Sequence, residues 1–344
     1  MAPTPDPRAR AVPLSPAAAS RGRRRLLRGL GGGAVALLLQ PRRAFAQGGD
    51  RTIRLILPIS AGSGADGVAR AMTGALGKSL GHAVVVENLP GAGGIPGTQQ
   101  IVKAPRDGFT LGLVSNNHVV NPSIYKSMPY DAVADITPVT VIGSTPFVLV
   151  AHPSVPAKNI PELLALARVR PGALNYASSG NGTIIQLAAE MLRDEAKIDI
   201  RHIPYRGTGP MVTDLLGGQV QLGVLAINVA MPHLKSGALR ALGLTSAKRS
   251  PLLPELPAIA EQGLPRYAIE GWIAVIGPAG LGRADTDRIY RAFKETVETP
   301  EVRDVLLAQG YTLQSLPPDA TAAWFRSERD RMAALVRQAG VKID

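Results

Sequence analysis

Short apolar runs alternate with amphipathic stretches through most of the chain. Residues 52–59 form a mostly apolar run, which predicts a buried strand. Residues 66–80 carry apolar positions at helical spacing, and Gly81 follows them where a helix commonly ends. Further strands are expected at 83–87, 110–115, 147–151, 174–177, 199–204, 220–225, 239–245 and 271–276, with helices between the four strands of residues 174–245. Further helices are expected at 160–168, 283–297, 300–309 and 320–338. This alternation is typical of an α/β fold with mostly parallel strands.

Composition limits the function classes. The chain has 344 residues and no cysteine, which excludes thiolate catalysis, cysteine-ligated zinc and a disulfide framework. Residues 1–46 hold nine arginines and one acidic residue, so the remaining 29 basic and 25 acidic residues have a net charge of only +4. The rest of the chain has no basic cluster of the kind that binds nucleic acid. The five histidines show no metal-ligand spacing, and no motif indicates a catalytic site.

The N-terminal segment has the parts of an export signal. Arg23, Arg24 and Arg25 precede an uncharged stretch at 29–39, which is too short to span a bilayer that needs ~20 apolar residues. A small-x-small cleavage pattern ends at Ala46, and two more arginines just before it favour the twin-arginine route. The alternative is a basic, disordered N-terminus. We expect residues 1–46 to be a twin-arginine signal peptide and the mature chain to be periplasmic, long enough for about two domains.

Two glycine- and serine-rich loops each join an expected strand to an expected helix. The first covers residues 57–66 and the second residues 175–183. A helix N-terminus exposes unpaired backbone N–H groups and the positive end of the helix dipole, which together favour an anion. Two such loops facing each other across a cleft would hold a small molecule with a carboxylate. Each loop alone is equally well explained as a capped turn.

The first loop also fits a dinucleotide-binding motif. Gly62, Gly64 and Gly67 satisfy G-x-G-x-x-G between a strand and a helix, and Glu87 ends the next strand where such a fold has its ribose-binding acid. An exported NAD(P)-dependent oxidoreductase is therefore an alternative. Against it, the turn between strand and glycines is not tight, and Asp66 would bring a negative charge close to the pyrophosphate.

Seven segments along the chain match the sequence motifs of one protein family, in the same order. They are residues 53–58, 84–94 (with E-N-L-P-G-A-G-G), 105–111, 174–183, 204–207, 214–220 and 244–250. Together they resemble the tripartite tricarboxylate transporter solute receptors, also called the Bordetella uptake gene family. The resemblance runs from about Thr52 to the C-terminus. So many ordered matches are far more specific than a single glycine motif.

The resemblance implies an α/β fold of the type II periplasmic binding-protein kind, with two α/β domains joined by a hinge and a ligand cleft between them. The corresponding boundaries are 50–147 with 272–344 for domain 1, and 148–271 for domain 2. It implies a periplasmic solute-binding receptor rather than an enzyme, without cofactor or metal. The implied partners are a small carboxylate and the large and small membrane subunits of a transporter, and we expect a monomer. Some relatives are implied to sense ligands for a membrane signalling protein instead.

The family also implies ligand-binding residues, with the carboxylate held largely by backbone amides of the first loop. Carried over to this chain, they are Ser60, Ala61, Gly62, Ser63, Gly64, Asp66, Asn116, Asn117, Ser178, Ser179, Gly180, Asn181, Gly182, Thr183 and Tyr205. The family's P-A-G-G after the first strand is here Ser60-Ala61-Gly62-Ser63, which keeps the backbone donors and adds hydroxyls. Leu225 and Ala226 stand where relatives often have an acid, which argues against an amino-acid ligand.

Overall fold

The computed structural model describes residues 51–341, all of which lie in one unit of the chain, Gly48–Asp344. The expected signal peptide and its cleavage site lie outside the described residues. Among residues 51–341, no helix is long and apolar enough to cross a membrane.

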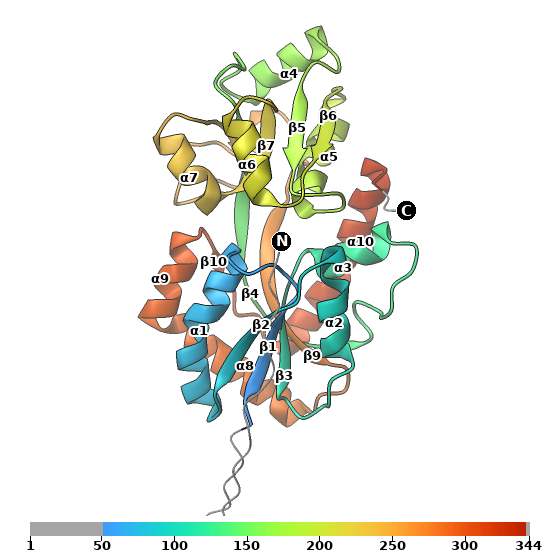
Figure 1. Cartoon of the computed structure of the whole chain (residues 1–344), viewed down its shortest axis with the longest axis vertical. Coiled ribbons are helices and arrows are strands. Elements are labelled where there is room, and N and C mark those ends of the chain that lie inside the picture. The colour runs from blue at the N-terminus through green and yellow to red at the C-terminus, as the bar shows by residue number, and fades with distance from the viewer. Residues whose placement is uncertain (1–50, 342–344) are drawn as a thin grey trace, which may run out of the picture. The chain divides into compact units, whose positions relative to one another are not determined.

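The first lobe is built around strand β1 (Ile53–Leu57). The lobe also contains β2 (Val84–Asn88), η1 (Ala92–Gly94), β3 (Thr110–Ser115), β10 (Thr312–Leu313) and the helices α1 (Gly64–Leu80), α2 (Ile95–Val102), α3 (Asn117–Ile124), α8 (Arg283–Glu298), α9 (Pro300–Ala308) and α10 (Pro318–Ala339). Side chains of β1 alternate between two hydrophobic clusters, because successive strand residues point to opposite faces of a sheet. Helices α1, α8 and α9 cover one face, and α2, α3 and α10 cover the other (Figure 1).

The second lobe repeats this arrangement with a smaller sheet. It contains β5 (Asn175–Ser178), β6 (Arg201–Pro204), β7 (Leu222–Ala226), β8 (Arg240–Leu244), α4 (Ile160–Val169), α5 (Ile184–Ala196), α6 (Thr208–Leu216), α7 (Ile227–Lys235) and η2 (Ala260–Gln262). Strand β5 pairs in parallel with β6 and β7, so the loops that follow β5 and β6 leave the sheet at the same edge.

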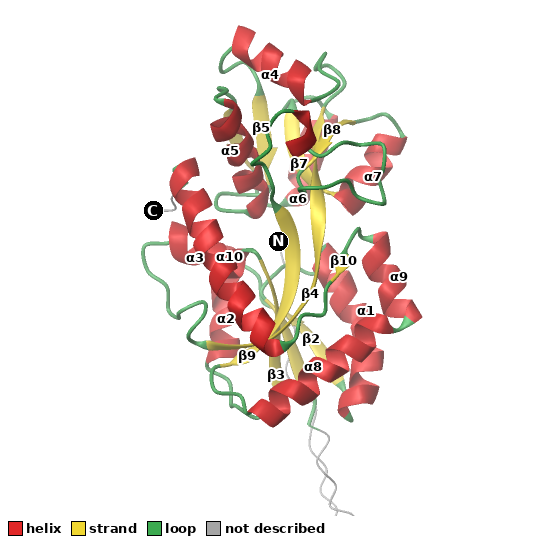
Figure 2. Cartoon of the chain, turned by 180° about the vertical axis from the view of Figure 1, so that it is seen from behind, coloured by secondary structure: helices red, strands yellow, loops and turns green. Residues whose placement is uncertain are grey.

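Two long strands connect the lobes. Strand β4 (Ile136–Ala151) pairs with β9 (Glu270–Pro278) up to Pro146, and with β7 and β8 from Phe147 onward. Figure 2 shows β4 running through both lobes. The full order is β2-β1-β3-β9-β4-β7-β5-β6, with β8 and β10 paired to β4. The expected domain boundaries fall within β4 and β9 and stay a prediction.

The observed elements correct the sequence analysis in three places. The strands are not mostly parallel, because every pairing of β4 and β9 is antiparallel. The strand expected at 147–151 is the end of the 16-residue β4, whose first part contains Pro138 and is interrupted by register shifts, where a sheet tolerates proline. Helices α2 and α3 were not expected, since each has only eight residues and α3 contains Pro122.

Candidate functional site

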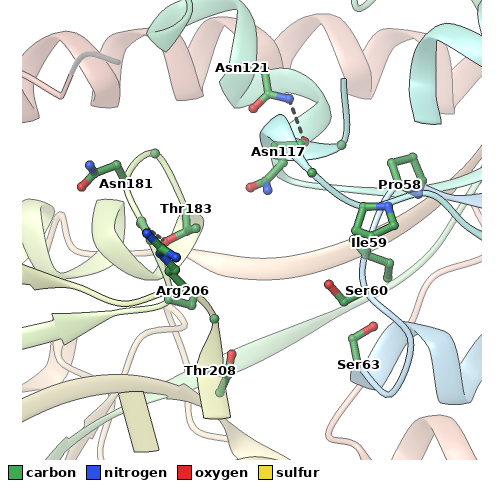
Figure 3. A pocket seen from close by; sticks show the side chains of 18 of the residues that line it. Pro58, Ile59, Ser60, Ser63, Asn117, Asn121, Asn181, Thr183, Arg206 and Thr208 are labelled. Atoms are coloured by element: carbon green, nitrogen blue, oxygen red, sulfur yellow. Dashed lines mark hydrogen bonds between the residues drawn. The ribbon is translucent and has the colours of Figure 1, made fainter. Parts of the chain in front are cut away.

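A cavity of about 680 Å³ lies between the lobes. In Figure 3, Ser60 and Ser63 lie on one side of it and Thr183, Arg206 and Thr208 on the other. The expected site residues that line it are Ser60, Ala61, Gly62, Ser63, Asn117, Ser179, Gly180, Asn181, Gly182 and Thr183. Five other expected residues do not: Gly64, Asp66, Asn116, Ser178 and Tyr205. The structure therefore brings the two predicted loops to one cavity. Several of their polar side chains do not line the cavity but form hydrogen bonds within the loops.

The first loop forms one wall between β1 and α1. Ser63 caps α1, because its Oγ accepts a hydrogen bond of 3.3 Å from the Asp66 N–H. Gly62 has φ +79°, a conformation that favours glycine. Its N–H donates to Asp66 Oδ2 at 2.9 Å, so this amide is already used inside the loop. Gly64 begins α1 and does not line the cavity, and a Cβ at this position would lie 2.8 Å from Gln309 Oε1.

Asp66 supports the first loop from beneath. Its side chain is buried with 4% of its surface exposed, and it accepts hydrogen bonds from Gly62, from Arg70 Nε at 3.1 Å and from Asn88 Nδ2 at 3.0 Å. Burial raises the pKa of this carboxyl, but the bonds from Arg70, Gly62 and Asn88 outweigh it and lower the pKa below its ordinary value. Asp66 is therefore an ionised brace of the loop, and its side chain does not line the cavity.

The first loop still offers backbone donors to the cavity. The N–H groups of Ser60, Ala61 and Ser63 have no hydrogen-bond partner within the described residues. They lie beside the N-terminus of α1, where the helix dipole adds positive potential. A carboxylate could accept from these groups without meeting a protein side chain of like charge.

The second loop forms the opposite wall between β5 and α5. Thr183 caps α5 by accepting from the Gln186 N–H at 3.4 Å, and its Oγ1 donates to the Gly180 carbonyl at 2.9 Å. The Gly182 N–H donates to Gln186 Oε1 at 2.7 Å. Ser178 is fully buried behind the loop, where its hydroxyl bonds to Gly180, so it shapes the wall without lining it.

A segment after β6 completes the second wall. The hydroxyl of Tyr205 donates to Asp214 at 2.8 Å, and Tyr205 does not line the cavity. Burial, and then the bond to Asp214, raises the pKa of Tyr205 to about 12. Its neighbour Arg206 lines the cavity, as do Gly207 and Thr208 at the start of α6. Arg206 lies in the segment 204–207 that resembles the family, but it is not among the residues expected at the site.

Asn116 and Asn117 separate at the end of β3. Asn117 lines the cavity at the first position of α3. Asn116 is 2% exposed and spans to β9 instead, where its side chain donates to the Glu270 carbonyl at 3.0 Å and accepts from the Trp272 N–H at 3.1 Å. It satisfies backbone groups at the start of β9, and it does not line the cavity.

The first wall also contains a glycine-rich segment that was not among the expected site residues. Gly91, Gly93 and Gly94 line the cavity, and Asn121 Nδ2 holds the Gly93 carbonyl at 2.9 Å (Figure 3). A Cβ on Gly94 would lie 2.5 Å from the Pro58 carbonyl oxygen, so a larger residue does not fit there. These glycines belong to the P-G-A-G-G segment that resembles the family. The sequence pattern alone does not predict that this segment folds back onto the loop after β1.

The electrostatics of the cavity favour an anion. Five helices have their N-cap or first residue in the lining: the N-caps are Ser63 of α1, Gly94 of α2, Thr183 of α5 and Gly207 of α6, and Asn117 is the first residue of α3. Their dipoles and unpaired N–H groups add positive potential at one place. Among the described lining residues Arg206 carries the one charged side chain, and none is acidic. In the described part of the chain, no group of three or more His, Cys, Asp or Glu is arranged to hold a metal ion.

The geometry disfavours the dinucleotide alternative. Glu87 is held by Arg54, whose Nε and Nη2 donate to the two carboxylate oxygens at 2.8 and 2.6 Å. It does not line the cavity, and neither does Gly67. The acid that would bind a ribose is therefore used in an ion pair between β1 and β2.

Comparisons with known proteins agree with this picture. Residues 68–341 match the family model described as Tripartite tricarboxylate transporter family receptor. The chain is 35% identical over 326 residues to the UPF0065 protein in the tcbD-tcbE intergenic region of Pseudomonas sp. strain P51, covering 93% of this chain and 96% of that protein. It is also 35% identical over 295 residues to Protein BugT of Bordetella pertussis, covering 85% and 90%.

Solved structures share the fold. The periplasmic binding protein BugD is 29% identical with a TM-score of 0.76, covering 86% of this chain and 99% of its own. The R. palustris protein Rpa4515 with adipate is 29% identical with a TM-score of 0.78, covering 85% and 98%. MatC from Rhodopseudomonas palustris with bound malate is 27% identical with a TM-score of 0.74, covering 83% and 99%. The expected periplasmic binding-protein fold is confirmed.

Proposed function

The chain belongs to the tripartite tricarboxylate transporter family of receptors, and from that premise we propose that it captures a small organic acid in the cavity between its lobes. The ligand is a dicarboxylate, a tricarboxylate or a related acid. After capture, the receptor delivers it to the large and small membrane subunits of a secondary transporter. It acts as a periplasmic monomer, exported by the twin-arginine route with cleavage near Ala46.

The observation that carries this proposal is the concentration of positive potential in a cavity without acidic side chains. Five helix N-termini and Arg206 meet there. Backbone donors of the first loop suit one carboxylate, and the Arg206 guanidinium across the cavity suits another, since arginine pairs readily with carboxylates. Adipate in Rpa4515 and malate in MatC are dicarboxylates bound by relatives of the same fold.

Capture requires the lobes to move, and we propose a hinge in β4 and β9. The domains on either side are 50–147 with 272–344, and 148–271. Binding proteins commonly close around their ligand in this way. A receptor that signals to a membrane protein instead of a transporter would use the same closure, so the two roles differ in the partner and not in the cavity.

Calorimetric titration tests the proposed ligand class. Adipate and malate are titrated into the purified mature chain, with the uncharged diamide of adipic acid as the matched control. We expect saturable binding of at least one acid and none of the diamide. Native mass spectrometry of the protein as purified is expected to reveal an organic acid. Binding of neither acid, together with tight and saturable binding of NADH, would overturn the receptor in favour of the oxidoreductase.

A further inference from the structure

His202 lies behind the second loop and outside the cavity. It belongs to β6, where it is paired with Tyr176 of β5, and the two rings stack with centroids 4.9 Å apart and planes 20° from parallel. Both ring nitrogens have hydrogen-bond partners that in turn hold the loop. Nε2 lies 2.6 Å from Ser178 Oγ, and Nδ1 lies 3.3 Å from Gln186 Nε2.

The Gln186 side chain determines which nitrogen of His202 carries the proton. Gln186 Oε1 accepts from the Gly182 N–H at 2.7 Å, so the amide NH₂ group points at His202 Nδ1. An NH₂ group only donates, so Nδ1 must accept and carries no proton. A neutral imidazole then has its proton on Nε2. Turning the glutamine over would leave the Gly182 N–H facing another donor.

The Ser178 hydroxyl fits the same assignment. It can accept twice and donate once. It accepts from His202 Nε2–H and from the Gly180 N–H at 3.2 Å, and it donates to the Gly180 carbonyl at 3.0 Å. Every donor then has an acceptor. A proton on Nδ1 would set two donors against each other at Gln186.

We propose that His202, neutral and protonated at Nε2, is a positioning residue for the second ligand loop. Through Ser178 it orients the peptide groups at Gly180, and through Gln186 it fixes the Gly182 amide. His202 touches no ligand, and its effect on affinity rests on the proposed function. Its effect on the loop does not.

The charged groups around His202 favour the neutral ring. Burial lowers the pKa of His202, and Arg193 on α5 acts electrostatically in the same direction, so this pKa falls to about 4. Glu190, on the same helix, accepts from the Tyr176 hydroxyl and pairs with Arg193 at 2.7 Å, so its charge is compensated. On β6 itself, Arg201 is exposed. The loop is therefore held in one state at neutral pH.

The first experiment measures the tautomer without any ligand. Long-range ¹H–¹⁵N spectra of the uniformly labelled mature chain, with His202 assigned by comparison with the His202→Gln variant, report the protonation of each ring nitrogen. We expect Nε2 protonated and Nδ1 bare at pH 7, with no change until well below pH 6. A proton on Nδ1, or a ring that titrates near the ordinary 6.5, would overturn the proposal.

The second experiment compares two substitutions by amide hydrogen exchange. His202→Phe keeps a ring to stack on Tyr176 but removes both hydrogen bonds, and we expect the Gly180 and Gly182 amides to exchange about 3- to 10-fold faster. His202→Gln can still donate to Ser178, so it should restore protection at Gly180 and not at Gly182. His152→Phe, which removes a ring bonded to Ser154, is the control and should leave both amides unchanged. Equal protection at both amides in all variants would overturn the proposal, even if one variant folds poorly.

Titration with adipate and malate separates this proposal from the receptor function. If one acid binds, His202→Phe should weaken its binding about 3- to 10-fold, and His202→Gln should recover part of the loss. If neither acid binds the wild-type chain, the proposed ligand class fails, but the tautomer and the exchange rates still decide the role of His202. If His202→Phe speeds exchange of both amides but leaves the affinity unchanged, the order of the second loop does not affect ligand binding.

Discussion

The two loops of the cavity present the same kind of backbone surface but are held by different chemistry. Beneath the first loop lies an ionised carboxylate, Asp66, which gathers bonds from Gly62, Arg70 and Asn88. Behind the second loop lies an uncharged network in which Gln186 and Ser178 bond to the neutral ring of His202. Both leave the cavity without an acidic side chain among its described lining residues.

This difference predicts different sensitivities. A charge-assisted brace is strong, and it lasts as long as the carboxylate stays ionised. A neutral network depends on each group holding one donor and acceptor pattern, so a single added proton disrupts it. The first loop should therefore respond most to removal of a charge, and the second to addition of one.

Removing the Asp66 carboxylate should have the largest effect. Asp66→Ala deletes three hydrogen bonds to a buried ionised group, and we expect it to lower the free energy of unfolding by about 2–3 kcal/mol. The ion pair with the half-exposed Arg70 contributes little to this sum, because solvent screens it. Urea denaturation of the mature chain measures the change.

The control is Asp287→Ala, which breaks an exposed ion pair with Arg283 on α8. It should cost under about 1 kcal/mol. Asp66→Asn keeps the shape of the side chain but offers an NH₂ group to Arg70 or Asn88, so it should fall between the two. Equal stability of Asp66→Ala and Asp287→Ala would mean that the first loop is not braced by the carboxylate.

The contributions of the two loops to stability should also depend on pH over different ranges. The folded-state pKa of Asp66 lies below its ordinary 3.8, so its contribution is present above that value and is lost only as the pH falls further. The pKa of His202 falls from 6.5 to about 4, so the unfolded state binds a proton across that window and stability drops as the pH is lowered through it. Buried His118, with a pKa lowered by burial to about 4, adds to the same drop.

Unfolding titrations between pH 7 and 4 test this assignment. The slope of unfolding free energy against pH reports the number of protons taken up on unfolding, and His202→Gln should lower that number by up to about one. Proton uptake by His118 should account for part of the slope that remains. His152→Gln changes a partly exposed histidine of the same lobe and serves as the control. An unaltered slope in His202→Gln would show that the neutral ring is not part of the second loop's stability.

Arg206 gives the second wall a charge that the first wall lacks. Arg206→Met keeps the length of the side chain, and we expect it to weaken binding of a dicarboxylate by about 1.5 kcal/mol, the lower value for a hydrogen bond to a charged group. Stability should change by less than about 0.5 kcal/mol, because Arg206 is exposed. Calorimetry at two salt concentrations measures the loss of binding free energy and shows how far salt screens the charge interaction. Unchanged affinity for both adipate and malate would leave the cation without a role in recognition.

The sequence predicted the parts of the molecule that local pattern controls. Strand β1 and helix α1 follow from apolar spacing and from Gly81 after the helix, and both loops of the cavity follow from glycine and serine at strand ends. An acid in the first turn of a helix commonly bonds to nearby N–H groups, and Asp66 does so at the Gly62 N–H.

Tertiary contacts decided the rest. Asn116 and Asn117 are neighbours of one residue type, but one faces β9 and the other the cavity, because only one can point into the cleft at the start of α3. Gly94 reaches the site through a close approach to Pro58 that no local pattern encodes. The extent of β4 was hidden because its first part holds proline and is interrupted by register shifts.

The smallest difference between the loops lies in their helix caps. Ser63 and Thr183 each accept from an N–H three residues on, and replacing a capping hydroxyl costs about 1 kcal/mol of stability. Thr183 also donates to the Gly180 carbonyl, so Thr183→Ala should exceed Ser63→Ala by about 0.5 kcal/mol in urea denaturation. Ser79→Ala, at the far end of α1, should change stability by less than about 0.5 kcal/mol.

The first-loop residues can also be tested through their effect on ligand binding. If the anion is held by backbone N–H groups, Ser63→Ala should weaken binding by only about 0.5–1.5 kcal/mol, the worth of one hydrogen bond. Gly62→Pro should weaken it far more, because proline cannot adopt φ +79° and removes the N–H that Asp66 holds, so the loop loses its shape. The opposite ranking, with binding abolished by Ser63→Ala and tolerated in Gly62→Pro, would assign recognition to the hydroxyl. The two walls would then differ in how they bind the ligand as well as in how they are held.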